Sequence, residues 1–275
     1  MNKKLLIVCM AMLLSVTLIA GCGPSNGSID PATTPKAQAS DWDYISQKGT
    51  LTIGITLFSP MNYYEGSELT GFETEFAKAV CEKLGVTPEF VEINWDTKEV
   101  ELNAKNIDCI WNGMTITDER KENMAISIPY MANRQVMIVK SENKDKYTES
   151  VDGAVVVAEK GSTGEALAEE NEFFSKASFT AVDAQSTGLM DVASGTSDVV
   201  IGDYVMAVGS IGEGTDYKNL VLIDKDFTDD QYGVAFRKGS DTVEKVNAAI
   251  QELAADGTLK EIADRYKLGE LLLIK

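Results

Sequence analysis

The sequence contains no histidine. A Ser-His-Asp or Cys-His catalytic mechanism is therefore excluded, and so is any metal site with histidine ligands. Cysteine is scarce too, with 4 in 275 residues. Cys9 and Cys22 lie near the amino terminus, which leaves Cys81 and Cys109, too few for a zinc site made of cysteine alone. We expect neither a bound metal nor a cofactor.

Cys81 and Cys109 both stand in apolar sequence. Cys81 follows Ala79-Val80, and Cys109 lies between Ile107 and Ile110. This context predicts two buried thiols. A disulfide is the alternative, because the sequence does not give the distance between them.

Positive charge is also sparse. The chain has 25 Lys and Arg against 43 Asp and Glu, a net charge of −18. Such acidity argues against a nucleic-acid partner, whose phosphates need a basic surface. It names no ligand, because strong acidity also serves solubility.

The first 21 residues have the pattern of an export signal. Lys3 and Lys4 precede an apolar run from Leu5 to Ala20, which is too short to be assigned as a membrane-spanning helix. The run ends in Leu18-Ile19-Ala20-Gly21-Cys22, which resembles a bacterial lipobox. This resemblance implies cleavage before Cys22 and a lipid on Cys22, which would anchor the protein at the extracytoplasmic face of the cell membrane. The alternative is an ordinary signal peptide with a cysteine nearby.

Residues 22–40 are rich in Pro, Ser, Thr, Gly and Ala and show no apolar periodicity. A segment of this composition cannot bury a core, so we expect a flexible tether. Loss of residues 1–21 would remove Lys3 and Lys4 and change the net charge from −18 to −20. The body, residues 41–275, is long enough for one large domain or two lobes.

Short β-rich runs alternate with helical patterns along the body, which predicts an α/β fold with parallel sheets. The expected strands are Leu51–Ile55, Phe90–Ile93, Ile107–Trp111, Gln135–Lys140, Val155–Ala158, Asp198–Ile201 and Tyr232–Phe236. The expected helices are Phe72–Leu84, Lys98–Ala104, Thr117–Asn123, one opening at Lys160–Gly164, Gln185–Ser194, Thr242–Ala255 and Leu259–Tyr266.

Several motifs occur in one order along the body. They are Gly49-Thr50-Leu51-Thr52-Ile53-Gly54, Leu69-Thr70-Gly71-Phe72-Glu73, Lys105-Asn106-Ile107-Asp108, Gly113-Met114-Thr115-Ile116-Thr117-Asp118-Glu119-Arg120, Pro129-Tyr130, residues 194–203 and residues 232–238. Together they resemble the bacterial extracellular solute-binding proteins of family 3, the polar amino-acid-binding proteins of ABC importers. Each motif alone is weak, but the resemblance covers essentially the whole body.

The resemblance implies a two-lobed, type II periplasmic-binding-protein-like fold with sheets flanked by helices. Lobe 1 would consist of residues 41–132 and 229–275, and lobe 2 of residues 133–228. The chain would cross between lobes near 131–135 and 226–231, and these crossings would act as hinges when ligand closes the lobes. The expected protein is a monomer that works with a membrane permease.

The charges of a free amino acid suggest their partners. A carboxylate suits a planar guanidinium, and the family places such an arginine at Arg120. Thr115 would donate its hydroxyl and N–H to the same carboxylate. Asp203, after an apolar strand, matches the family's partner for the ammonium. Without the family, Arg120 would be interpreted as a solvated helix charge and Asp203 as a strand-end cap.

Other expected contacts surround these. Carbonyls at Asn112 and Gly113 would face the ammonium, and the helix start at Ser162 and Thr163 would face the carboxylate. The plainer interpretations are a strand-to-loop turn and an ordinary N-cap. The resemblance also places Phe58 and Trp95 as apolar walls. Core packing is the alternative for both.

The ligand's side chain is not predicted. Many relatives carry an acid in the stretch that here reads Ile55-Thr56-Leu57-Phe58, and no acid is present. Lys160 matches a lysine that meets a side-chain carbonyl in glutamine-type relatives, whereas Glu159 would prefer a cationic side chain. Neighbours at a strand end face opposite ways, so we expect only one of them to point into the cleft.

The leading hypothesis is a transport protein that binds an L-amino acid and performs no chemistry. One alternative is an enzyme on the same scaffold, similar to the family's cyclic-acid dehydratases, with Glu159 as its acid or base. Another is a sensor that presents the closed form to a receptor.

Overall fold

The computed structural model describes residues 40–274. The predicted signal segment and residues 22–39 of the predicted tether, with Cys22, lie outside the described residues, as does Lys275. Ser40, which we assigned to the tether, instead caps the first helix, because its Oγ accepts a hydrogen bond from the Asp43 N–H at 2.9 Å. Within residues 40–274, every helix is too short or too polar to span a bilayer.

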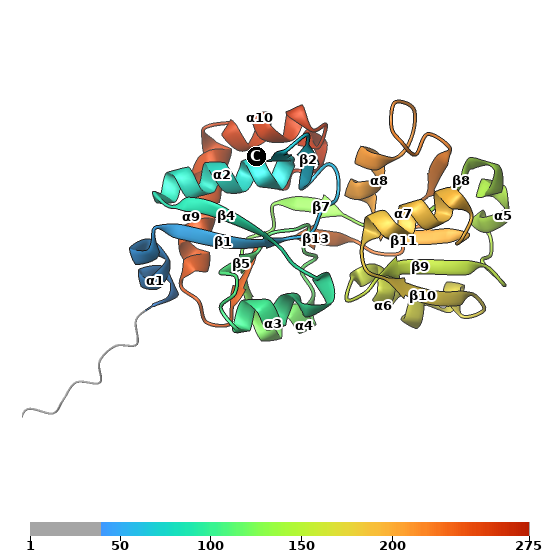
Figure 1. Cartoon of the computed structure of the whole chain (residues 1–275), viewed down its shortest axis with the longest axis horizontal. Helices are drawn as coiled ribbons and strands as arrows, with labels where there is room; N and C mark the ends of the chain where they lie inside the picture. The colour runs from blue at the N-terminus through green and yellow to red at the C-terminus, as the bar shows by residue number, and fades with distance from the viewer. Residues whose placement is uncertain (1–39, 275) are drawn as a thin grey trace, which may run out of the picture. The chain divides into compact units, whose positions relative to one another are not determined.

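Five strands form the first sheet, in the order β4-β1-β5-β14-β6. Their bounds are Thr87–Glu92, Thr50–Ile55, Cys109–Ile110, Ala235–Arg237 and Met124–Ile126 in that order. β1 runs parallel to β4 and β5, whereas β14 runs antiparallel to β5 and β6. The helices of this part of the chain are α1 (Asp41–Lys48), α2 (Phe72–Leu84), α3 (Lys98–Asn103), α4 (Asp118–Asn123), α9 (Thr242–Ala255) and α10 (Thr258–Arg265). In Figure 1, α2 and α10 lie above this sheet and α3 and α4 below it.

The second sheet has the order β10-β9-β11-β8-β12. Its strands are Ser178–Val182, Val155–Glu159, Val199–Asp203, Gln135–Lys140 and Leu220–Ile223 in that order. β9 is parallel to β10 and β11, and β8 is antiparallel to β11 and β12. The helices here are α5 (Lys144–Thr148), α6 (Thr163–Glu170), α7 (Gln185–Ser194) and α8 (Tyr204–Ser210).

Two short strands connect these regions. β7 (Met131–Asn133) pairs antiparallel with β13 (Asp230–Tyr232), and Figure 1 shows this pair between the two sheets. The single strand predicted over 232–236 was wrong. Tyr232 belongs to β13, whereas Ala235 starts β14 in the first sheet. The strand breaks at Gly233, which packs so closely that a Cβ there would lie 2.7 Å from Ile126 Cγ2.

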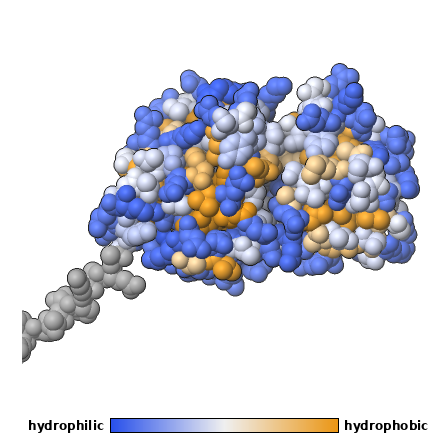
Figure 2. All heavy atoms as spheres, viewed as in Figure 1, coloured by the Kyte–Doolittle hydropathy of each residue, from blue (hydrophilic) through white to orange (hydrophobic). Residues whose placement is uncertain are grey.

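Apolar side chains at helical spacing hold α2 on the first sheet. Phe72, Phe76 and Val80 are fully buried, and the Phe76 ring meets Trp111 edge-on with centroids 5.1 Å apart. Cys81 and Cys109 are both buried free thiols, so the alternative of a disulfide is not realised. Burial raises the pKa of Cys81 to about 12. Polar residues cover most of the outline of the face in Figure 2, and apolar residues show mainly in its middle.

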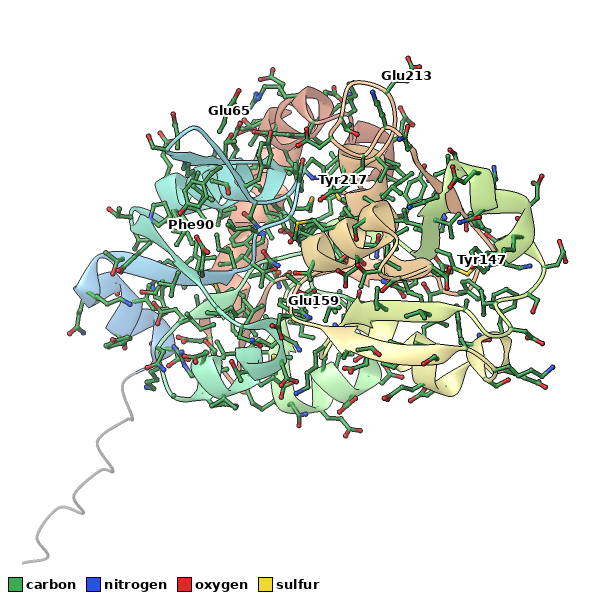
Figure 3. All side chains as sticks on the ribbon, turned by 45° about the vertical axis from the view of Figure 1, so that its right-hand side comes forward. Glu65, Phe90, Tyr147, Glu159, Glu213 and Tyr217 are labelled. Carbon is green, nitrogen blue, oxygen red and sulfur yellow. The ribbon has the colours of Figure 1, made fainter. Side chains whose placement is uncertain are left out.

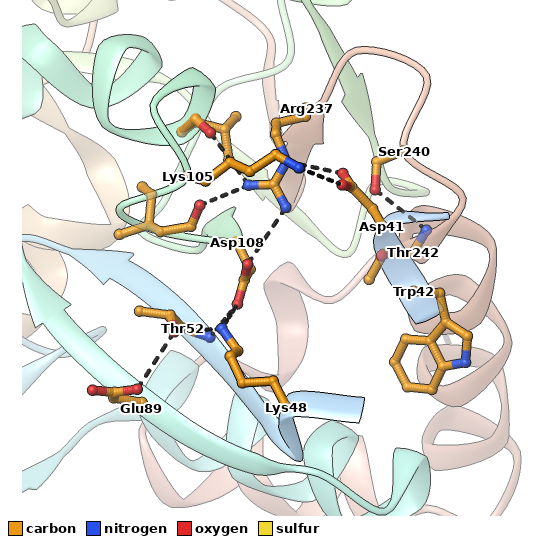
Figure 4. Close-up of polar contacts among 12 residues, drawn as sticks. Asp41, Trp42, Lys48, Thr52, Glu89, Lys105, Asp108, Arg237, Ser240 and Thr242 are labelled. Atoms are coloured by element: carbon orange, nitrogen blue, oxygen red, sulfur yellow. Dashed lines mark hydrogen bonds and ion pairs between the residues drawn. The ribbon is translucent and has the colours of Figure 1, made fainter. Parts of the chain in front are cut away.

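A buried polar network joins α1 to the first sheet (Figure 4). Arg237 on β14 contacts Asp41 through Nε at 2.9 Å and Asp108 through Nη2 at 3.4 Å. Its Nη1 donates to the carbonyls of Leu102 and Ile107. Lys48 in turn lies 2.6 Å from Asp108. Every charge in this network therefore has a partner of opposite sign.

Candidate functional site

A cavity lies where the carboxyl ends of parallel strands from both sheets meet. Ligand sites of open α/β sheets form at such strand ends. Trp95 follows β4, Asn112 follows β5, and Glu159 and Asp203 end β9 and β11. The full lining is Trp95, Asn112, Gly113, Thr115, Arg120, Glu159, Ser162, Thr163, Gln185 and Asp203.

Eight of the ten residues predicted as ligand contacts line this cavity. They are Trp95, Asn112, Gly113, Thr115, Arg120, Ser162, Thr163 and Asp203. The other two, Phe58 and Lys160, do not belong to the lining. The local geometry explains both differences.

Phe58 lies behind Gly113, not at the cavity surface. A Cβ on Gly113 would come within 2.9 Å of Phe58 Cζ, and the φ of Gly113 is +55°. Glycine is therefore the residue that this position accepts. Phe58 thus contacts the lining at Gly113 without belonging to it, and its role as an apolar wall stays a prediction.

Lys160 points out of the cavity. Its Nζ lies 3.0 Å from Asp96 Oδ2, and its side chain is 57% exposed. Glu159, its neighbour at the end of β9, is 4% exposed and lines the cavity. Successive side chains of a strand alternate in direction, so only one of the pair can face inward. Lys160 thus forms an ion pair between regions of the two sheets, and its contact with the ligand stays a prediction.

Arg120 is buried without a carboxylate partner. Thr117 caps its helix, α4, by accepting the Arg120 N–H at 3.2 Å. The guanidinium donates to two carbonyls, Nη1 to Thr115 at 2.8 Å and Nη2 to Gly161 at 3.2 Å. Burial lowers the pKa of Arg120. Its charge has no ion-pair partner among residues 40–274, so the cavity wall carries an uncompensated cation.

Asp203 is the opposite case, a buried carboxylate held by neutral donors. Its Oδ1 accepts from Asn133 at 2.6 Å and from Gln135 at 2.8 Å, and its Oδ2 accepts from Gln185 at 2.5 Å. Burial raises its pKa. The three amides fix the orientation of the carboxylate, but none of them neutralises its charge.

The start of α6 contributes a third polar element. Ser162 is its N-cap and accepts the Glu165 N–H at 3.1 Å. The Glu165 carboxylate accepts the Gly161 N–H at 2.6 Å. Because Ser162 and Thr163 both line the cavity, the positive end of the helix dipole lies at its wall.

Sequence reasoning missed three residues of the site. Gln185 was assigned only as a helix start, yet it both donates to and accepts from Asp203. Glu73 was noted only as part of a motif. It is fully buried and accepts the Gly113 N–H at 2.8 Å and the Tyr130 hydroxyl, and burial raises its pKa to about 7. It therefore fixes the loop after β5.

Lys98 is the third. Its ammonium donates to the carbonyls of Trp95 at 3.1 Å and Gly161 at 3.0 Å, and it lies 4.7 Å from the centre of the Trp95 ring. Burial lowers its pKa to about 8. A lysine in a helix turn normally suggests a solvated charge, so no local signal marks it.

Comparison with known proteins agrees with this geometry. The family model described as bacterial extracellular solute-binding proteins, family 3, matches residues 51–270. The chain belongs to this family. The α/β, type II periplasmic-binding-protein-like fold expected from the sequence is thereby confirmed.

Three similar proteins illustrate the family. The L-cystine-binding protein TcyJ of Escherichia coli strain K12 is 30% identical over 227 residues, 81% of this chain and 84% of that protein. A Streptococcus pneumoniae ABC uptake transporter substrate-binding protein with bound histidine has 30% identity and a TM-score of 0.76, covering 82% of this chain and 96% of its own.

The third is the ancestral amino acid-binding protein AncCDT-1, described as a precursor of cyclohexadienyl dehydratase. It has 31% identity and a TM-score of 0.74, covering 82% of this chain and 99% of its own. The family thus consists of extracellular solute-binding proteins, and one similar structure is that of an amino acid-binding protein described as the precursor of an enzyme.

Proposed function

We propose that the chain binds a free polar L-amino acid in this cavity and delivers it to the permease of an ABC importer. The supporting observation is that Arg120 and Asp203 line the same cavity and that neither has an oppositely charged partner among the described residues. A zwitterion supplies both missing charges at once. A simple acid or a simple amine would leave one of them buried and unpaired, which is costly.

Each end of the zwitterion has a set of partners. The carboxylate would receive the Arg120 guanidinium, the Thr115 hydroxyl and N–H, and the N–H groups at the start of α6 near Ser162 and Thr163. The ammonium would donate to Asp203. Carbonyls at Asn112 and Gly113 would complete its contacts, and Trp95 would cover the side chain.

Binding would close two lobes, 41–132 with 229–275 and 133–228. Contacts between them already surround the cavity: Lys98 and Arg120 donate to the Gly161 carbonyl, and Lys160 pairs with Asp96. β7 and β13 would serve as the hinge. The protein would act as a monomer.

The predicted leader and tether complete the proposal. Cleavage before Cys22 and a lipid on Cys22 would hold the protein at the extracytoplasmic face of the cell membrane, next to the permease. Globomycin inhibition of signal cleavage, read as a mass change of the mature protein, tests this part. An unlipidated mature protein would contradict the anchor and leave the binding role standing.

The binding role is tested by thermal shift of the protein from Cys22 onward against the twenty L-amino acids, cystine and ornithine. A ligand at about 100 times its dissociation constant adds roughly 2.7 kcal/mol, or several degrees of melting temperature. We expect one or a few L-amino acids to shift the wild type and none to shift Arg120→Met or Asp203→Asn. No shift with any amino acid would contradict the proposal.

A dehydratase-like enzyme is the second candidate, and one observation favours it. Glu159 is a carboxyl inside the cavity whose pKa burial raises to about 8, as a general acid at neutral pH requires. NMR of a ligand after prolonged incubation separates the two functions. An unchanged ligand supports transport, and a dehydrated product supports the enzyme.

A further inference from the structure

The charges lining the cavity do not balance for a neutral amino acid. The lining holds one cation, Arg120, and two carboxyl groups, Asp203 and Glu159. A zwitterion would satisfy Arg120 and Asp203, as proposed above. Glu159 would remain without a partner.

Glu159 lies inside the molecule at the end of β9, between the regions of the two sheets (Figure 3). It is 4% exposed and forms no ion pair with a lysine or arginine of residues 40–274. Burial first, and then the charge of Asp203, raise its pKa to about 8. The carboxyl therefore faces the cavity in a place that disfavours its charge until a cation arrives.

The charged groups around Glu159 do not supply that cation. The charge of Lys98 on α3 acts to lower the pKa of Glu159, but the Lys98 ammonium donates to the carbonyls of Trp95 and Gly161 and is not part of the lining. Arg120 on α4 is assigned to the ligand carboxylate. The α7 side chain there is the neutral Gln185, and Asp230 on β13 is held by Gln135 at 3.2 Å.

A second hollow adjoins the cavity and shares Arg120, Ser162 and Thr163 with it. Its lining adds five glutamates, Glu99, Glu119, Glu165, Glu169 and Glu170, and one lysine, Lys98. A hollow with this excess of carboxylates raises the local concentration of cations. The neighbouring hollow and the cavity thus favour the same sign of ligand charge.

We infer that Glu159 selects the ligand's side chain, and that the ligands are L-amino acids with a second positively charged group. Arginine, lysine and ornithine have such a group, and the distal ammonium of cystine is another. This inference rests on the proposed function, because it assigns the α-carboxylate to Arg120 and the α-ammonium to Asp203. The second cation would displace the Glu159 proton and pair with the carboxylate.

Isothermal titration calorimetry of the protein from Cys22 onward tests this with arginine, ornithine, cystine and glutamine. We expect at least one of arginine, ornithine and cystine, which carry a second positively charged group, to bind about 10-fold or more tightly than glutamine. Glu159→Gln should remove that advantage and change glutamine binding by less than about 3-fold, because only the charged pair is lost. Glu172→Gln is the matched control, an equal charge change at an exposed site outside both hollows.

Proton release gives a readout that a structural role would not move. Titrations at pH 7 in two buffers of different ionisation enthalpy should show protons released on binding to the wild type and to Glu172→Gln, and fewer released on binding to Glu159→Gln. The inference is wrong if Glu159→Gln keeps the preference, or if an amino acid without a second positively charged group binds best. If no amino acid binds the wild type, or if Arg120→Met and Asp203→Asn bind normally, the proposed function itself fails.

Discussion

Arg120 and Arg237 are both arginines of 8% exposure, one in the cavity wall and one in the core. Arg237 has two carboxylates, Asp41 and Asp108, and two carbonyls as partners. Arg120 has two carbonyls and no carboxylate. The two arginines are thus equally buried, but the charge of Arg237 is neutralised by carboxylates and the charge of Arg120 is not.

The difference in charge compensation separates a structural arginine from one that can still pair with a ligand. A buried charge with a complete set of partners serves the fold, because removing any member leaves the rest unpaired. A buried charge that is hydrogen-bonded only to neutral groups is held in one orientation, but it is not neutralised. We therefore propose Arg120, Asp203 and Glu159 as binding groups because they line the cavity and lack an oppositely charged partner, and not because they are buried.

Arg237→Ala should cause the largest change in stability. It leaves Asp108 buried with Lys48 as its only cation, and breaking such a network costs about 3–5 kcal/mol. Urea unfolding measures the loss. Arg265→Ala, which removes an exposed pair with Glu75, is the control and should cost less than about 1 kcal/mol. Equal losses in the two variants would contradict the contrast between closed and exposed networks.

Arg120→Met should have little effect on stability without ligand but should abolish stabilisation by ligand. Methionine fills similar space without an unpaired charge, so the free energy of unfolding without ligand should fall by less than about 1 kcal/mol or rise. The roughly 2.7 kcal/mol that saturating ligand adds to the wild type should disappear. Urea unfolding with and without the best ligand checks both parts. A loss like that of Arg237→Ala would show that Arg120 is a structural charge.

A third effect concerns the pH dependence of stability. Burial raises the pKa of Glu73 to about 7 and of Glu159 to about 8, above their value of 4.5. Between pH 5 and 8 the folded state holds protons that the unfolded chain has released, so stability without ligand should decrease as pH rises through this window. Melting temperatures at constant ionic strength should fall from pH 5 to 8, and less in Glu159→Gln. A flat or rising profile would contradict these shifts.

Regular amphipathic patterns made much of the fold predictable. Phe72–Leu84, Gln135–Lys140, Gln185–Ser194 and Thr242–Ala255 have the predicted bounds. Tyr232–Phe236 did not, because its apolar run spans two partners: Tyr232 pairs with Met131, and Ala235 pairs with Ile110. Propensity identifies extended chain but not the strand that it joins.

The sequence predicted those site residues that belong to the family motifs. The family pattern located Arg120, Thr115 and Asp203, all of which line the cavity. Gln185 and Lys98 were missed because their roles depend on carbonyls and carboxylates distant in sequence, at Asp203 and Gly161. Alternation at the β9 end predicted that one of Glu159 and Lys160 faces inward, but only the register of the sheet decides which.

The placement of the tryptophans has an optical consequence. Trp95 lines the cavity, whereas Trp111 is fully buried beside Phe76. The fluorescence of an indole depends on its polar surroundings. Emission from Trp95 would therefore vary with what fills the cavity, while Trp111 in the core and Trp42 on α1, both outside the lining, would provide a constant background. The protein thus carries an intrinsic, label-free reporter of its own occupancy.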